Sequence, residues 1–276
     1  MPGVNFFPCT AGYRNATMAW VPLTRFLAKA PSLGPRERVD GEASSHEAYD
    51  ADMLTLLALV PSSDALRHVA CIPDTRLCVH ERGERVLVRP CGAPAPRGWA
   101  RRIDVRAGVV VTDVRSAPTL WLPAGFEQAL DGCRRRGKRF AVCNLGLYDR
   151  RALGTGHANA LVFDLRARRV ERFDPAGAVG VERSMRRLFR AHLPGWSYVG
   201  IASTIQAVSD AHSGLCVTYA LMFTLLRLLN PERDAREVAA YMVRGTPDGV
   251  RRRALRLNRF MMDTLRRHPH GSLRRL

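Results

Sequence analysis

The chain has 276 residues, 46% of them hydrophobic, so it can bury a large core, and its composition excludes intrinsic disorder. Its 43 basic and 25 acidic residues give a formal charge of +18. That charge attracts polyanions at low salt. Only Lys29 and Lys138 are lysines and all other basic residues are arginines, a bias that indicates a GC-rich coding sequence. A soluble surface coated with arginine therefore explains the positive charge as well as binding to a polyanion does.

The opening residues lack a basic stretch followed by an apolar core, so we expect no secretory signal. The uncharged run 211–226 is too short and too polar for a membrane span, so we expect no membrane partner. Seven irregularly spaced cysteines then favour free thiols in an intracellular, reducing compartment. Zinc is disfavoured at Cys71, Cys78, His80 and Cys91, because the spacing between the first two is too wide.

Residues 1–138 form an N-terminal region whose role the sequence does not indicate. Helical patterns are present at 18–27, at 45–59, from Ser62 or Ser63 to residue 69, and at 124–136. Strand patterns are present at 85–89 and 103–114, the latter with a β-branched run.

Residues 139–276 carry a more regular pattern and form the predicted core. Strands are expected at 139–148, 157–164, 168–175 and 196–204, and helices at 181–193, 216–230, 232–243 and 247–267. The short connection at 165–167 predicts a hairpin between the second and third of these strands. Strands with a hairpin, followed by helices, indicate an α+β fold.

Cys216 stands at the start of the long apolar helix that Pro231 ends. Ser213 and Gly214 disfavour helix just upstream, so Cys216 is expected in the first turn. There the unpaired N–H groups and the helix dipole favour a thiolate. A lone cysteine among apolar residues is also commonly a buried core residue, so the stretch by itself leaves both roles open.

Two further polar residues can meet this cysteine. His157 begins one strand of the predicted hairpin and Asp174 ends the other, so antiparallel pairing makes them neighbours at its open end. An imidazole oriented by a carboxylate and placed beside a thiol is the arrangement of nucleophilic catalysis.

Asp164 and Glu171 are the other acids that could orient the histidine. Asp164 lies seven residues along the same strand as His157, roughly 23 Å away at about 3.3 Å per residue. Glu171 and Asp174 are three residues apart and point to opposite faces. Asp174 lies nearer the level of His157, so it is the predicted partner.

The segments GHANALVFD, ERFDPAG and SGLCVTYALMF resemble the active-site blocks of clan CE cysteine peptidases, which include adenain and the SUMO-type ubiquitin-like-protein proteases. Their form is closest to versions from large DNA viruses. The resemblance covers about residues 139–230. It implies a papain-like or adenain-like α+β core, in which a mixed sheet packs on a central helix with the nucleophile at its N-terminus.

The resemblance implies His157 as general base, Asp174 as its orienting carboxylate and Cys216 as nucleophile. Three features depart from the family pattern. Ala158 stands where the family often has tryptophan. Around the cysteine the family often has Asp-Cys-Gly or Cys-Gly, whereas this chain has Gly-Leu before the cysteine and Val after it. The glutamine of the oxyanion hole usually lies six or seven residues before the cysteine. The candidate for that role here is Gln206, which lies ten residues before it.

The expected function is that of a cysteine peptidase that cleaves peptide or isopeptide bonds through a thioester. The resemblance implies a polypeptide substrate cut after glycine, in viral polyprotein processing or ubiquitin-like-protein removal. It implies no required cofactor, with stimulation by DNA as in the adenovirus relative left open. The site of action would be the host cytoplasm, the nucleus or the virion.

Two alternatives stand beside this prediction. One is an acetyltransferase on the same fold and triad. The other is a basic nucleic-acid-binding or virion structural protein with a vestigial triad, supported by nine arginines and one aspartate in residues 251–276. An amphipathic packing helix with a solvated basic face accounts for that segment more simply.

Overall fold

The computed structural model describes residues 20–23, 60, 63–82, 85–91, 96–99, 101–114, 116–148, 157–177, 181–205 and 215–267, except for the side chains of 81, 101–104 and 261–267. The helix expected at 45–59 and Gln206 lie outside these ranges. The helix expected at 18–27 is wrong where it can be compared, because 20–23 are not helical.

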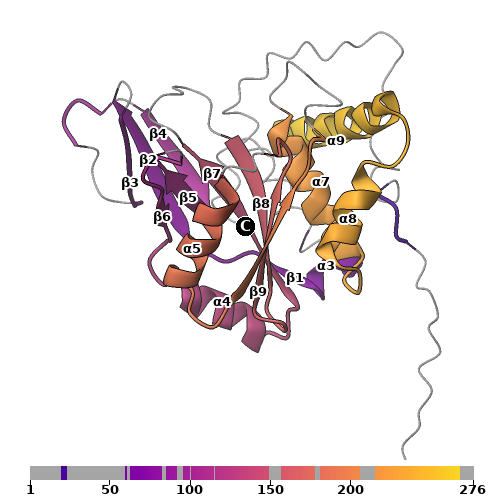
Figure 1. Cartoon of the computed structure of the whole chain (residues 1–276), viewed down its shortest axis with the longest axis horizontal. Coiled ribbons are helices and arrows are strands. Elements are labelled where there is room, and N and C mark those ends of the chain that lie inside the picture. The colour runs from indigo at the N-terminus through magenta and orange to yellow at the C-terminus, as the bar shows by residue number, and fades with distance from the viewer. Residues whose placement is uncertain are drawn as a thin grey trace, which may run out of the picture.

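The described elements follow the chain in a strand-rich first half and a second half where strands give way to helices (Figure 1). In chain order they are α3 (Asp64–Arg67), β1 (Ala70–Cys71), β2 (Arg76–Arg82), β3 (Arg85–Pro90), β4 (Arg101–Arg106), β5 (Gly108–Thr112), β6 (Thr119–Trp121), α4 (Phe126–Arg135), β7 (Phe140–Leu147), β8 (His157–Asp164), β9 (Arg169–Asp174), α5 (Glu182–His192), β10 (Ser197–Ala202), α7 (Cys216–Leu229), α8 (Ala235–Met242) and α9 (Pro247–Arg267).

A mixed seven-stranded sheet organises the molecule in the order β10-β9-β8-β7-β5-β6, with β1 also paired to β7. The pairs β1–β7, β5–β7 and β9–β10 are parallel, and the other pairs in this sheet are antiparallel. The α+β class with a mixed sheet is therefore confirmed. Because β1, β5 and β6 precede residue 139, the boundary expected at 138/139 falls inside the sheet. A second sheet, β3-β2-β4, is antiparallel.

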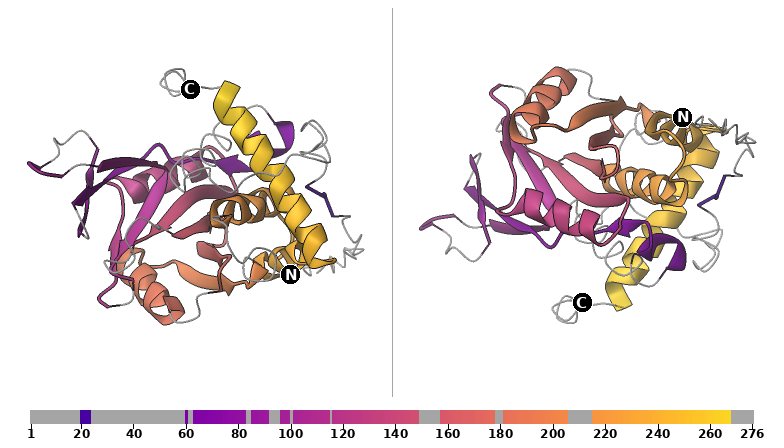
Figure 2. Two further views of the ribbon diagram at one scale, coloured as in Figure 1. Left: turned by 90° about the horizontal axis from the view of Figure 1, so that it is seen from above. Right: turned by 90° about the horizontal axis from the view of Figure 1, so that it is seen from below.

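Helices cover both faces of the large sheet. α7, α8 and α9 lie on one face with their own apolar cluster, while α4 and α5 lie on the other with a second cluster (Figures 1 and 2). All fourteen residues of α7 are buried, between β8 and β9 on one side and α8 and α9 on the other. A helix that is apolar on all sides is stable only when it is enclosed. The predicted central helix is thus confirmed.

The β8–β9 hairpin is confirmed as well. Its strands pair antiparallel, with Ala160 opposite Phe173 and Asp164 opposite Arg169. Asp164 Oδ1 accepts hydrogen bonds from the backbone N–H groups of Arg166 (3.1 Å) and Ala167 (2.9 Å), which closes the turn. This contact gives Asp164 a local structural role at the turn, the end of the hairpin away from His157.

The strand expected at 103–114 is instead two strands in different sheets. The chain turns at Ala107, whose φ is 43°, and β4 joins the small sheet while β5 joins the large one. A Cβ on Gly108 would lie 2.0 Å from Val105 Cγ1, so only glycine fits at this turn. The β-branched pattern on both sides of the break concealed it, because each half has strand propensity.

The expectation of free thiols is wrong for four cysteines. Disulfide bonds join Cys71 to Cys133, with Cα atoms 5.7 Å apart, and Cys78 to Cys91, with Cα atoms 5.0 Å apart. The first links β1 to α4 over 62 residues, a proximity that only the packed sheet creates. Three of the cysteines considered as zinc ligands are therefore in disulfides, and no cluster of metal-binding side chains occurs among the described residues.

Candidate active site

His157 and Asp174 meet at the open end of the β8–β9 hairpin. His157 is the first residue of β8 and Asp174 the last of β9. The imidazole Nε2 lies 2.7 Å from Asp174 Oδ1. The carboxylate is 1% exposed and the imidazole 25% exposed, so the ring bridges the protein interior and the surface.

The Asp174 carboxylate is fixed at both oxygens. Oδ1, besides contacting His157, accepts a hydrogen bond from the backbone N–H of Ala176 at 3.0 Å. Oδ2 accepts a hydrogen bond from Arg172 Nη2 at 2.6 Å. Burial alone raises the pKa of Asp174, but the hydrogen bond to His157 and the charge of Arg172 outweigh it and hold that pKa below its ordinary value. The carboxyl is therefore ionised at neutral pH.

Cys216 approaches His157 from the other side of the ring. It is the first residue of α7, is buried, and its thiol makes a hydrogen bond with the imidazole. One imidazole thus links a carboxylate to a thiol, which is the nucleophile–base–orienter geometry.

The surroundings of His157 keep its imidazole protonated at higher pH than is usual for a histidine. Burial by itself lowers its pKa, but the hydrogen bonds and charges of Asp174 and Cys216 outweigh burial and raise the pKa to about 9. A protonated imidazole can donate a proton to a leaving group at neutral pH.

The start of α7 directs unpaired backbone donors towards the same place. The first N–H groups of a helix have no acceptor within the helix, and the first turn of α7 carries no acidic side chain. These donors and the positive end of the helix dipole can hold an oxyanion. Gln206, the side-chain donor implied by the family resemblance, lies outside the described residues.

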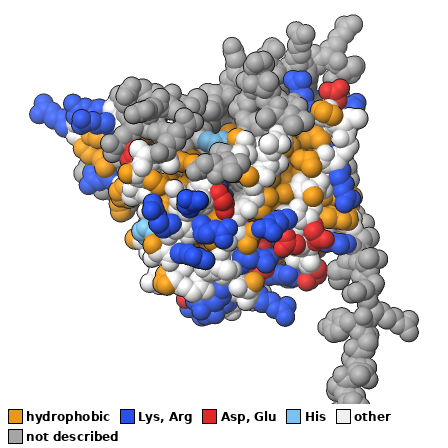
Figure 3. All heavy atoms as spheres, viewed as in Figure 1, with side chains coloured by type: hydrophobic (Ala, Val, Ile, Leu, Met, Phe, Trp, Pro, Cys, Tyr) orange, Lys and Arg blue, Asp and Glu red, His pale blue; other side chains and the backbone are white. Residues whose placement is uncertain are grey.

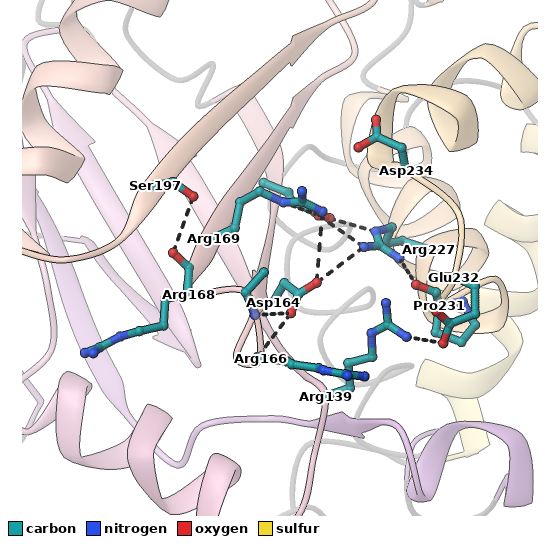
Figure 4. A network of polar contacts seen from close by, with 12 residues as sticks. Arg139, Asp164, Arg166, Arg168, Arg169, Ser197, Arg227, Pro231, Glu232 and Asp234 are labelled. Carbon is teal, nitrogen blue, oxygen red and sulfur yellow. Dashed lines mark hydrogen bonds and ion pairs between the residues drawn. The ribbon is translucent and has the colours of Figure 1, made fainter. Parts of the chain in front are cut away.

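Arg227 contacts both Glu171 and Asp164, and Figure 4 shows how Arg227 and Asp164 face each other. Arg227 Nε lies 2.7 Å from Glu171 Oε2, and Arg227 Nη2 lies 3.8 Å from Asp164 Oδ2. Arg227 is eleven residues after Cys216, about 16 Å along the helix at 1.5 Å per residue. Glu171 therefore faces α7, whereas Asp174 faces the opposite side, as strand alternation predicts.

Three residues near Asp174 were not singled out in the sequence: Arg172, Glu182 and Gly200. Arg172 lies in the middle of β9 with its side chain 2% exposed, and it contacts Asp174 and Glu182. A charged residue two positions before the predicted carboxylate, on the same strand face, is the one signal that could have marked it. Glu182 and Gly200 come from other elements and carry no such signal.

None of the described helices combines the length and apolarity needed to cross a bilayer. No protein-family profile and no curated protein matches this sequence. Among solved structures, the chain is similar to the Legionella pneumophila effector protein RavZ, with a TM-score of 0.35 and 9% identity. That match covers 81% of this chain and 70% of the other.

Proposed function

We propose that this protein is a cysteine peptidase, with Cys216 as nucleophile, His157 as general acid and base, and Asp174 as the orienting carboxylate. The observation that supports it is the single imidazole that contacts both Asp174 Oδ1, at 2.7 Å, and the Cys216 thiol. The likeness of the motifs around these residues to clan CE peptidases supports the same reaction.

In the first half of the reaction, the Cys216 sulfur attacks the scissile carbonyl carbon while the thiol proton resides on His157. The carbonyl oxygen becomes an oxyanion, held by backbone N–H groups at the start of α7 and, in our proposal, by the Gln206 amide. The C–N bond then breaks, and His157 gives its proton to the departing amine. The acyl group remains on sulfur as a thioester.

In the second half, a water molecule attacks the thioester carbonyl and passes a proton to His157. The C–S bond breaks, the acid product leaves, and the thiolate–imidazolium pair is restored. Asp174 keeps the ring oriented in both halves and stabilises its positive charge. The net change is the hydrolysis of one amide bond.

The substrate proposal derives from the family resemblance. We infer a polypeptide cut after glycine, at a peptide bond in a viral polyprotein or at the bond to a ubiquitin-like protein. No cofactor is required for the steps above, and DNA is proposed only as a stimulating polyanion. The reaction would take place in the host cytoplasm or nucleus, or in the virion.

The test is an electrophilic probe that ends in glycine, incubated with the full chain and followed by mapping of the modified cysteine. We expect modification of Cys216 that is lost in Cys216→Ala and strongly slowed in His157→Ala. Modification of another cysteine, or equal rates in wild type and His157→Ala, would contradict the proposal. Acetyl transfer from acetyl-CoA to a protein acceptor, without hydrolysis of glycine-containing peptides, would favour the acetyltransferase alternative.

A further inference from the structure

Arg172 is the centre of a buried network behind Asp174. Its guanidinium donates from Nε to Asn159 Oδ1 (2.6 Å), from Nη2 to Asp174 Oδ2 (2.6 Å) and from Nη1 to Glu182 Oε2 (3.1 Å). All three nitrogens therefore have an oxygen acceptor. The planar guanidinium fixes the relative orientation of these groups more tightly than an ammonium could.

The contact with Arg172 decides which way the Asp174 carboxylate points. Arg172 takes Oδ2, which leaves Oδ1 for His157. With Asp174 1% exposed, water cannot replace a missing donor at Oδ2. A buried carboxylate with an unpaired oxygen either rotates to another donor or takes up a proton, and either change weakens its hold on the imidazole.

Glu182 reaches Arg172 across an intervening strand. It lies in the first turn of α5, and its side chain passes over Gly200 of β10, which pairs with Arg172 of β9. A Cβ on Gly200 would lie 2.0 Å from Glu182 Oε2 and 2.2 Å from its carboxyl carbon. The backbone of Gly200 does not adopt a positive φ, so the role of this glycine is to leave room for the carboxylate.

Tyr198 also contacts the Glu182 carboxylate. Its hydroxyl donates to Glu182 Oε2 at 3.2 Å. Burial raises the pKa of Tyr198 to about 12, so the hydroxyl remains a donor at neutral pH. Glu182 is thus held between Tyr198 and Arg172, and α5 is connected through Arg172 to the acid behind His157.

We propose that Arg172, held by Glu182 over Gly200, is a positioning residue that keeps Asp174 oriented towards His157. This inference rests on the proposed peptidase function. It assigns to the pair of buried Arg172 and half-buried Glu182 an effect on the imidazole. The other ion pair of β9, Glu171 with Arg227, is buried and faces away from the imidazole.

The direct test is a pH titration of the His157 ring, monitored by NMR of the full chain with labelled histidine. The His157→Gln variant assigns the His157 signal. In Arg172→Met, we expect the His157 pKa to fall from about 9 towards its ordinary 6.5, because Asp174 no longer holds the ring. Loss of the Arg172 positive charge acting alone would move that pKa upward. An unchanged or higher value therefore overturns the proposal.

Gly200→Ala tests the same idea without altering a charged residue. The added methyl group meets the flexible end of Glu182, which moves aside and releases Arg172. We expect a smaller fall in the His157 pKa in a folded protein, so this variant decides the question if Arg172→Met does not fold. An unchanged titration in Gly200→Ala counts against the proposal.

Glu171→Gln is the matched control, because it disturbs the neighbouring residue of β9 and the other buried ion pair. It should lower stability and leave the His157 pKa at about 9. An equal fall of the pKa in this control would mean that any damage to β9 has the effect, and would refute a specific role for Arg172.

Cleavage assays separate this inference from the function it rests on. In Arg172→Met, kcat should fall by about tenfold to a hundredfold with KM unchanged, the range for a misplaced catalytic group. If wild type cleaves no glycine-containing peptide, the peptidase proposal fails, while the titration still decides whether Arg172 positions Asp174 and His157. A changed KM with unchanged kcat would assign Arg172 to substrate binding instead.

Discussion

At the scale of single residues, the imidazole of His157 joins the carboxylate of Asp174 to the thiol of Cys216. Each contact supplies something different. Asp174 fixes the ring and stabilises its charge, while the first turn of α7 gives Cys216 backbone N–H groups as neighbours. An aspartate or a cysteine is not unusual by itself. The proposed chemistry depends on the contact of both side chains with the same imidazole ring.

The first prediction concerns Asp174. Asp174→Ala should lower kcat/KM by about 10²–10⁴, the usual span for lost acid–base assistance, and Cys216→Ala should abolish turnover. Steady-state cleavage of a glycine-containing peptide measures both. Normal cleavage by a folded Asp174→Ala variant would show that another group orients His157.

The second prediction concerns pH. His157 must be protonated to release the amine, and its pKa is raised to about 9, so kcat/KM should decline above about pH 9. Asp174 contributes to that increase, so in Asp174→Asn the alkaline limb should move to lower pH. A pH profile of kcat/KM for the two proteins measures the shift, and an alkaline limb at the same pH in both would contradict it.

The third prediction concerns thiol reactivity. Among the described cysteines, four are in disulfides, and burial raises the pKa of Cys143 well above its ordinary value. Of the two free cysteines that the structure describes, Cys216 is the one that contacts His157. Iodoacetamide at pH 6, without reductant, should therefore modify Cys216 first, as mass spectrometry of peptides would show. Equal labelling of several cysteines would count against an activated Cys216.

At the scale of elements, the contact between β9 and α7 depends on a buried ion pair. Arg227 makes two hydrogen bonds with Glu171, at 2.7 and 3.1 Å, and its guanidinium lies over the ring of Phe140 at 4.4 Å from the centroid. Arg169 Nη2 adds a third contact to Glu171 at 2.7 Å. This pair joins the helix that carries Cys216 to the strand that carries Asp174.

The fourth prediction follows from that pair. Because Asp174, and not Glu171, is the predicted partner of His157, Glu171→Ala should leave activity within a few-fold of wild type. The structure adds that this change leaves the buried Arg227 charge without its main partner, at a cost of about 3–5 kcal/mol. Urea unfolding should show the loss, while kcat per folded molecule stays within a few-fold. The double variant Glu171→Leu with Arg227→Met should recover part of the stability.

At the scale of the whole molecule, positive charge is spread over the surface. In Figure 3, basic side chains recur across the visible described face, mixed with acidic and apolar ones. On α9, Arg251, Arg252 and Arg256 are exposed, while Val250, Ala254 and Leu257 are buried in the core around α7. α9 is therefore a packing helix that also has a basic outer face.

The fifth prediction concerns DNA. The net charge of +18 should give weak binding without sequence preference, with affinity that falls steeply as salt increases. Replacing Arg251, Arg252 and Arg256 by glutamine should reduce the salt slope of log K, by about 0.9 for each phosphate that the protein no longer neutralises. Fluorescence anisotropy over a salt series measures this. Binding that ignores salt, or that selects one sequence, would contradict an electrostatic origin.

The local features of this protein follow from the sequence by itself. Alternation and helical periodicity predict β7 to β10 and α4, α5, α7, α8 and α9, because these patterns reflect nearest neighbours along the chain. The short connection at 165–167 is enough to pair β8 with β9 and to bring His157 towards Asp174. Alternation also separates Asp174 from Glu171, since residues three apart on a strand face opposite sides.

Tertiary structure alone decides the features that join distant segments. The Cys71–Cys133 disulfide, the division of residues 101–112 between two sheets, and the passage of Glu182 over Gly200 depend on how the layers pack. Sequence periodicity reports which face of an element is buried and does not report which element will cover it. The identity of that covering element determines whether a buried charge such as Arg172 meets a partner.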